Sequence, residues 1–311
     1  MNCKCPLKSH RLILFAAVVS VITLSAVGLA AENKPEAPTA PATEVKPKPD
    51  PAKELAKKVA AAAKAWRKRL PKNFSIETWP PFVVAGDLKP ARLHGIMLRS
   101  VQKPAEALWQ QYFRTRPKEA VTILLFKNDK SYRKWAKKLF GDTRVSHFGY
   151  YRPGDRVMVM NIGTGTGTLV HEIVHALMAP DFPACPAWFS EGLGSLYEQC
   201  MVRPKGLEGL LNWRLPALLK ALREGRLRSL KDLITKGDFR GATEGLNYAQ
   251  ARYFCMYMQE RGVLEKYYRL FRAGAGKDPT GLKFVEEVFG KKSMKKVDKG
   301  YRDWLSSLKP E

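Results

Sequence analysis

The chain has 311 residues, 45% of them apolar, and carries 54 Lys and Arg against 29 Asp and Glu, which gives a formal charge of +25. This length allows one sizeable hydrophobic core and up to two subdomains. No zinc finger, RNA-binding signature or basic heptad accompanies the charge, so we do not expect nucleic acid as a partner. The charge indicates either an anionic partner, such as a cell-envelope polymer or a lipid surface, or a solvated basic face.

Residues 1–31 are typical of a signal peptide. The basic start "MNCKCPLKSHR" is followed by an apolar run from Leu12 to Ala30 that ends in small residues. This layout predicts a secretory signal cleaved after Ala30 or Ala31. The run is also nearly long enough to span a bilayer, so an uncleaved N-terminal anchor is the alternative. Both interpretations predict a protein that is secreted, periplasmic or anchored to the cell envelope.

The rest of the chain divides by composition. Residues 32–53 are rich in Pro, Ala and Lys and predict a disordered linker. Residues 54–72 contain strong helix formers and predict a basic helix. We expect a folded domain over 73–311, with a sheet-containing half at about 73–180 and a helical half at about 181–311.

Three cysteines lie beyond the signal segment, at 185, 200 and 255. A predicted helix of about twelve residues separates Cys185 from Cys200 and would hold them roughly 18 Å apart, too far for a disulfide. Any disulfide should therefore include Cys255, and buried free thiols are the simpler expectation.

The region after residue 73 is predicted to place a small sheet before a series of helices. Extended segments are expected on both sides of Pro80–Pro81, in "AVTILLF" and on both sides of the turn "RPGD". Helices are expected over the second half of 91–116 and over 129–141, where Gly141 would end the helix. From Thr168 onward the spacing is helical. This order predicts an α+β fold, with the small sheet packed on the helix at 168–179 and a mostly helical C-terminal subdomain after it.

The helix after Thr168 contains the sequence "HEIVH". His171 and His175 are one turn apart and face the same way, which is the spacing that lets two imidazoles bind one zinc ion. Glu172 lies about 100° round the helix, beside the metal position, where it can reach a water molecule. This arrangement predicts a metal-activated hydrolase with Glu172 as general base.

A third ligand is expected sixteen residues after the second histidine, at Glu191. Gly192 and Gly194 have no side chains to hold this second helix away from the first, so the carboxylate can approach the two imidazoles. Ser195 and Glu198 follow one and two turns later, where either could accept the far N–H of an imidazole.

These segments resemble a known family. "LVHEIVHALM" followed by "PAWFSEGLGSLYE" resembles the gluzincin branch of zinc metallopeptidases, the peptidase MA-like group. The resemblance covers roughly residues 73–274, is strongest over 169–198, and implies a zincin-like fold. It also implies one Zn²⁺ ion held by His171, His175 and Glu191. Better-known members often carry a carboxylate one turn after the third ligand, and this chain has Ser195 there.

The resemblance implies a zinc-dependent peptidase that hydrolyses peptide bonds outside the cytoplasm. It also implies that the helix "LNYAQARYF" packs near the cleft, which makes Tyr248 the best candidate for an oxyanion donor. A core aromatic is the alternative for Tyr248; His147 and Tyr150 are weaker candidates for the donor.

Two other functions remain open at this point. The first is a non-catalytic binding module that keeps a metallopeptidase fold and holds an anionic envelope component. The second is a structural protein tethered by its linker, with the helical subdomain as the partner surface. An intact Glu172 favours the enzyme, because a pure binding module needs no general base.

Overall fold

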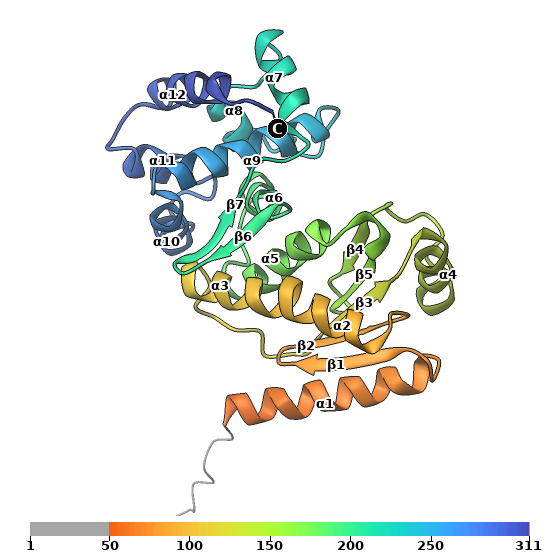
Figure 1. The fold of residues 1–311 in the computed structure, drawn as a ribbon. Coiled ribbons are helices and arrows are strands. Elements are labelled where there is room, and N and C mark those ends of the chain that lie inside the picture. The colour runs from red at the N-terminus through yellow and green to blue at the C-terminus, as the bar shows by residue number, and fades with distance from the viewer. Residues whose placement is uncertain (1–49, 311) are drawn as a thin grey trace, which may run out of the picture. The chain divides into compact units, whose positions relative to one another are not determined.

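A five-stranded mixed sheet forms the first half of the α+β unit seen in the computed structural model, which describes residues 50–310 (Figure 1). Its strands are β1 (Ser75–Trp79), β2 (Phe82–Gly86), β3 (Val121–Phe126), β4 (Gly149–Arg152) and β5 (Val157–Asn161). The strand order is β1-β2-β3-β5-β4; the three inner strands are parallel, and each outer strand is antiparallel to its neighbour. The predicted fold class, a small sheet followed by a mostly helical part, is confirmed.

Helices cover both faces of the sheet, and every residue of the three inner strands is buried. One face packs on α1 (Pro51–Arg69) and α4 (Asp129–Phe140), and Trp66 of α1 donates to Thr122 Oγ1 of β3 at 2.8 Å. The other face packs on α2 (Pro90–Ile96), α3 (Lys103–Gln111) and α5 (Gly167–Asp181). The helix that carries the "HEIVH" sequence, α5, therefore shares one face of the sheet with α2 and α3.

Several expected boundaries hold in this half. The "AVTILLF" run forms β3, whose six residues are all buried. Asn128 accepts a hydrogen bond from the Ser131 N–H at the start of α4, and Gly141 ends that helix with φ of 75°. Helical structure from 90 to 111 is more extensive than expected: it begins at Pro90, and a π-helical segment (Met97–Gln102) joins α2 to α3.

The second half is mostly helical. Its helices are α6 (Ala187–Leu196), α7 (Leu215–Arg223), α8 (Leu230–Thr235), α9 (Glu244–Glu260), α10 (Leu264–Gly274), α11 (Leu282–Val288) and α12 (Met294–Ser307). A two-stranded hairpin of β6 (Cys200–Arg203) and β7 (Gly206–Gly209) interrupts them and was not predicted. The hairpin lies between α3 and α9 (Figure 1), so it connects the two halves.

The predicted location, which was secreted, periplasmic or anchored to the cell envelope, is corrected by the structure. Among residues 50–310, none of the helices is long and apolar enough to cross a membrane. The predicted signal peptide or anchor (1–31) and most of the predicted linker lie outside the described residues. The linker prediction also extended too far, since α1 begins at Pro51, where the Asp50 side chain accepts a hydrogen bond from the Ala52 N–H at 2.9 Å.

The three cysteines at 185, 200 and 255 are free thiols, as expected. Cys255 is fully buried in α9, and burial raises the pKa of the Cys200 thiol to about 12. These thiols therefore stay protonated near neutral pH, which makes them poor nucleophiles.

The last residue of α5, Asp181, ties this helix to both halves. Its Oδ1 accepts the backbone N–H groups of Arg114 and Thr115 at 2.9 and 2.7 Å. Its Oδ2 accepts the Tyr268 hydroxyl at 2.8 Å and lies 3.0 Å from Arg272 Nε. The carboxylate side chain is wholly buried. Among the described residues it is the one acceptor for the Tyr268 hydroxyl and for the two backbone N–H groups, whereas Arg272 Nε also donates to the Asp181 main-chain oxygen at 2.8 Å.

We expect Asp181→Ala to lower the free energy of unfolding by about 3 kcal/mol, because it leaves buried donors without an acceptor. Urea denaturation measures the change. The matched control is Asp303→Ala, which removes an exposed carboxylate paired with Lys299 and should change stability by less than about 0.5 kcal/mol. Equal effects of the two substitutions on the free energy of unfolding would contradict the stabilising role of the Asp181 carboxylate.

Candidate metal centre

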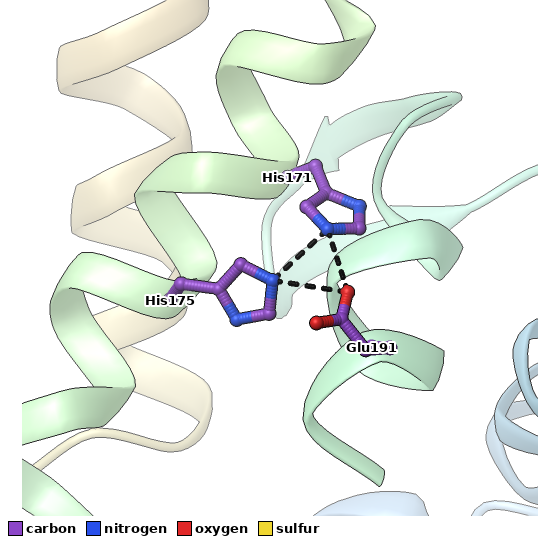
Figure 2. A group of neighbouring side chains, drawn as sticks. All are labelled: His171, His175 and Glu191. Carbon is purple, nitrogen blue, oxygen red and sulfur yellow. Dashed lines mark hydrogen bonds and ion pairs between the residues drawn. The ribbon is translucent and has the colours of Figure 1, made fainter. Parts of the chain in front are cut away.

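The centre is built from α5 and α6, whose facing surfaces bring three side chains to one point (Figure 2). His171 and His175 project from successive turns of α5, and Glu191 projects from α6 toward them. Glu191 Oε2 lies 3.2 Å from His171 Nε2 and 3.3 Å from His175 Nε2, and the two Nε2 atoms are 2.9 Å apart. In the part of the chain that the structure describes, this is the one group of three or more His, Cys, Asp or Glu side chains close enough together to hold a metal ion.

Glycines allow the helices to approach this closely. A Cβ atom at Gly194 would lie 3.1 Å from two atoms of the His171 ring, so any side chain there would press on the ligand. Gly192 has a different role from the one predicted: it faces α9, where a Cβ would lie 3.0 Å from both the Ala251 carbonyl oxygen and Cys255 Sγ. One glycine thus sets the approach of α6 to α5, and the other sets its approach to α9.

The far nitrogens of both imidazoles face polar partners. His171 Nδ1 lies 3.4 Å from Glu198 Oε1, a separation long for a hydrogen bond, so the contact is mainly electrostatic. Arg214 fixes that carboxylate with two bonds of 2.9 and 3.1 Å. His175 Nδ1 lies 3.0 Å from the Ser190 hydroxyl. Such partners orient imidazole ligands toward a metal.

Ser195, the other residue expected to orient an imidazole, does not do so. Its hydroxyl is fully buried and has no hydrogen-bond partner among the described residues. Glu198 is near an imidazole as predicted, and Ser190 takes the role given to Ser195. Ser190 precedes Glu191 directly, and the sequence offered only its hydroxyl as a signal.

The electrostatics of the centre favour a positive charge. Burial by itself lowers the pKa of His171, but the Glu191 and Glu198 carboxylates outweigh it and raise that pKa to about 10. Burial likewise raises the pKa of Glu191, and the two imidazoles outweigh it and hold the pKa well below its usual range. A proton on His171 thus balances the buried carboxylate, and a bound cation would take the place of that proton.

The centre opens into a cleft of about 730 Å³. Glu172 lines this cleft together with the two histidines, and Tyr248 of α9 lines it near Glu191. Burial first, and then the nearby Glu191 carboxylate, raises the pKa of Tyr248, so its hydroxyl keeps its proton. One cleft is therefore lined by the three predicted metal ligands, the predicted general base and the best candidate for the oxyanion donor: His171, His175, Glu191, Glu172 and Tyr248.

Arg240 also lines the cleft, and sequence reasoning missed it. Its guanidinium donates to Glu191 Oε1, the carboxylate oxygen that does not face the imidazoles, and it also lies 3.7 Å from Glu244. Arg240 is in the loop before α9, where no periodic pattern marks it. Its charge stabilises the ionised form of Glu191 and leaves Oε2 directed at the histidines.

The two weaker candidates are placed elsewhere or are already occupied. His147 is 60% exposed and lies 3.5 Å from Asp129, away from the cleft lining. Tyr150 does line the cleft, but its hydroxyl donates to Asp142. Neither is placed to donate to a substrate bound at the centre.

No protein-family model and no curated protein matches this chain. The assignment of the centre therefore depends on its own geometry: three convergent ligand atoms, oriented imidazoles and an open cleft beside a fourth carboxyl group.

We expect Glu198→Ala to weaken divalent-cation binding by about 10- to 100-fold, because His171 loses the carboxylate that orients it. Titration with Co²⁺, followed by its visible absorbance, measures the affinity. Ser195→Ala, near the end of α6, is the matched control and should leave the affinity within about twofold, since its hydroxyl has no partner among the described residues. Indistinguishable affinities in the two variants would contradict the proposed role of Glu198.

Proposed function

We propose that this chain is a zinc-dependent peptidase of the gluzincin type. The observation that carries the proposal is the convergence of His171, His175 and Glu191 on one point, with Glu172 lining the same cleft. Two imidazoles and one carboxylate are the ligand set of hydrolytic zinc sites that keep a fourth position for water or substrate. A purely structural site would be closed by a fourth protein ligand, and no described residue supplies one.

The distances between the ligand atoms are compatible with zinc. Tetrahedral zinc with nitrogen and oxygen ligands at about 2.0–2.2 Å requires ligand atoms roughly 3.3 Å apart. The three separations in this centre are 2.9, 3.2 and 3.3 Å, so the side chains need to move by only a few tenths of an ångström. Magnesium and calcium, by contrast, prefer sites built from oxygen ligands alone.

The bound ion would supply Lewis-acid activation of a water molecule and of the substrate carbonyl. Glu172 supplies the proton transfer. Its carboxylate accepts the proton of the attacking water and passes it to the leaving amine nitrogen. The side chain is half-buried and opens onto the cleft, so it is accessible to substrate and also partly shielded from bulk solvent.

Tyr248 is proposed as the donor to the developing oxyanion. Its hydroxyl is protonated near neutral pH and borders the same cleft as Glu172. A phenol held on a helix costs little reorganisation when charge develops on the carbonyl oxygen. Arg240 adds a positive charge on the same side and holds Glu191, which keeps the third ligand in place.

We expect Glu172→Gln to keep zinc and to lower the turnover number at least about 10³-fold, because the amide cannot accept the proton. Zinc content is measured by mass spectrometry, and turnover with denatured casein and a fluorogenic peptide library. The wild-type activity should be lost with a chelator and restored by zinc. Glu265→Gln on α10 is the control. Unaltered turnover in Glu172→Gln, with zinc retained, would rule out Glu172 as the general base.

Tyr248→Phe should lower the turnover number about 10²-fold with little change in KM, because the hydroxyl acts on charge that appears only in the transition state. Tyr257→Phe removes a hydroxyl from the same helix outside the cleft lining and serves as the control. If KM rises and the turnover number is unchanged, Tyr248 binds the ground state and is not the oxyanion donor.

A further inference from the structure

A second groove, of about 600 Å³, lies on the hairpin side of α5. None of the three candidate metal ligands lines it, and it shares only Glu198 and Arg214 with the surroundings of the metal centre. Four large apolar side chains are exposed in the part of the chain that the structure describes, namely Phe148, Met201, Val202 and Trp213. All four line this one groove. Single exposed apolar residues need no explanation, but a cluster confined to one concave surface indicates a binding site.

The two edges of the β6–β7 hairpin differ in whether their outward main-chain groups are hydrogen-bonded. On β7, the Gln111 side-chain amide bonds both the N–H and the C=O of Leu207, at 2.7 and 3.1 Å. The Gln259 amide does the same for Gly209, at 2.8 and 3.0 Å. These two glutamines satisfy the outward main-chain groups of β7, so that edge is closed to a further strand.

The edge of β6 is open. Val202 and Cys200 stand opposite Leu207 and Gly209, and in an antiparallel pair such partners turn their main-chain groups outward together. Within residues 50–310, no hydrogen bond reaches the outward N–H or C=O of either residue. Both residues line the groove. The open edge is thus adjacent to the apolar side chains.

The charges of the groove are unbalanced. Glu198 is its acidic member and already pairs with Arg214. Arg99 and Lys103 also line the groove, and neither forms an ion pair with another described residue. The groove therefore combines two free positive charges with apolar surface, in a chain whose formal charge is +25.

We propose that this groove binds an extended polypeptide segment carrying acidic and large apolar side chains, which adds to the hairpin as a third strand beside β6. The main-chain groups of Cys200 and Val202 pair with the segment, the apolar side chains lie against Trp213 and Phe148, and an acidic side chain meets Arg99 and Lys103. The proposal does not rest on the peptidase activity, because it concerns binding at a surface separate from the metal ligands.

The probe is a fluorescein-labelled decapeptide that alternates glutamate with valine and phenylalanine, and fluorescence anisotropy with the full chain measures its binding. We expect saturable binding that persists when metal is removed by a chelator. The same peptide with lysine in place of glutamate should bind at least about tenfold more weakly. A version N-methylated at alternate residues loses the main-chain donors on one edge and should also bind about tenfold more weakly.

Protein variants test the same contacts. Val202→Pro removes an outward N–H without touching a bond between β6 and β7, and it should weaken binding about tenfold, whereas Val202→Ala keeps the N–H and should bind within about threefold of wild type. Arg99→Glu with Lys103→Glu should weaken binding, and the same reversals at Lys57 and Lys64 on the exposed face of α1 should not. Circular dichroism checks that each variant is folded.

Three results would overturn the proposal. The first is the absence of saturable binding by the acidic peptide at millimolar concentration. The second is equal binding by the Val202→Pro and Val202→Ala proteins, or by the plain and N-methylated peptides. The third is dimerisation in sedimentation velocity that Val202→Pro abolishes, which would assign the edge to a second copy of the chain. Loss of peptidase activity in the Glu172→Gln protein with unchanged peptide binding leaves the proposal standing.

Discussion

The close crossing of α5 and α6 is the constraint on which the metal centre depends. The crossing is possible because residue 194 has no side chain; even one methyl group would lie within 3.1 Å of the His171 ring. At this separation the Glu191 carboxylate on α6 contacts the His171 and His175 imidazoles on α5 directly. The ligands are thus set by the packing of two helices, and rigid elements hold such geometry more precisely than loops do.

The position of α6 depends in turn on α9. Arg252 of α9 is fully buried and donates to the carbonyl oxygens of Ser195 and Leu196, at 3.0 and 3.4 Å, near the end of α6. Burial lowers the pKa of Arg252 to about 10, so the guanidinium is still charged at neutral pH. Its positive charge interacts favourably with the negative C-terminal end of the α6 dipole. Tyr248 lies one turn earlier on α9. A single helix therefore supports the helix that carries Glu191, the candidate third ligand, and places the Tyr248 phenol in the same cleft.

Much of this centre could be predicted from the sequence, because regular helices convert spacing into direction. The four-residue spacing of His171 and His175 placed both on one face, and the glycines after Glu191 indicated a close approach. Residues outside regular periodicity could not be found in this way. Arg240 lies in a loop, and its reach to Glu191 follows from the tertiary fold.

The hairpin and Ser190 were missed for different physical reasons. Three of the four residues of β6 are exposed, so no alternation of apolar and polar positions marks the strand, and helical spacing on both sides suggested a continuous helical region. Ser190 and Ser195 are both on α6, and the choice between them depends on the rotation of that helix about its axis. Sequence spacing gives the relative angle of two residues, but the absolute rotation is set by packing against α5 and α9.

The two glutamines that close the edge of β7 have a mechanical consequence. Gln111 belongs to α3, in the sheet-containing half, and Gln259 belongs to α9, in the helical half, and each forms two hydrogen bonds with the same short strand. Any hinge-like separation of the halves must break one of these bonded pairs, and Asp181 adds a second tether at the far end of α5. These bonds oppose a change in the distance between the two halves, so the cleft beside the candidate metal centre should keep nearly the same width whether it is empty or occupied.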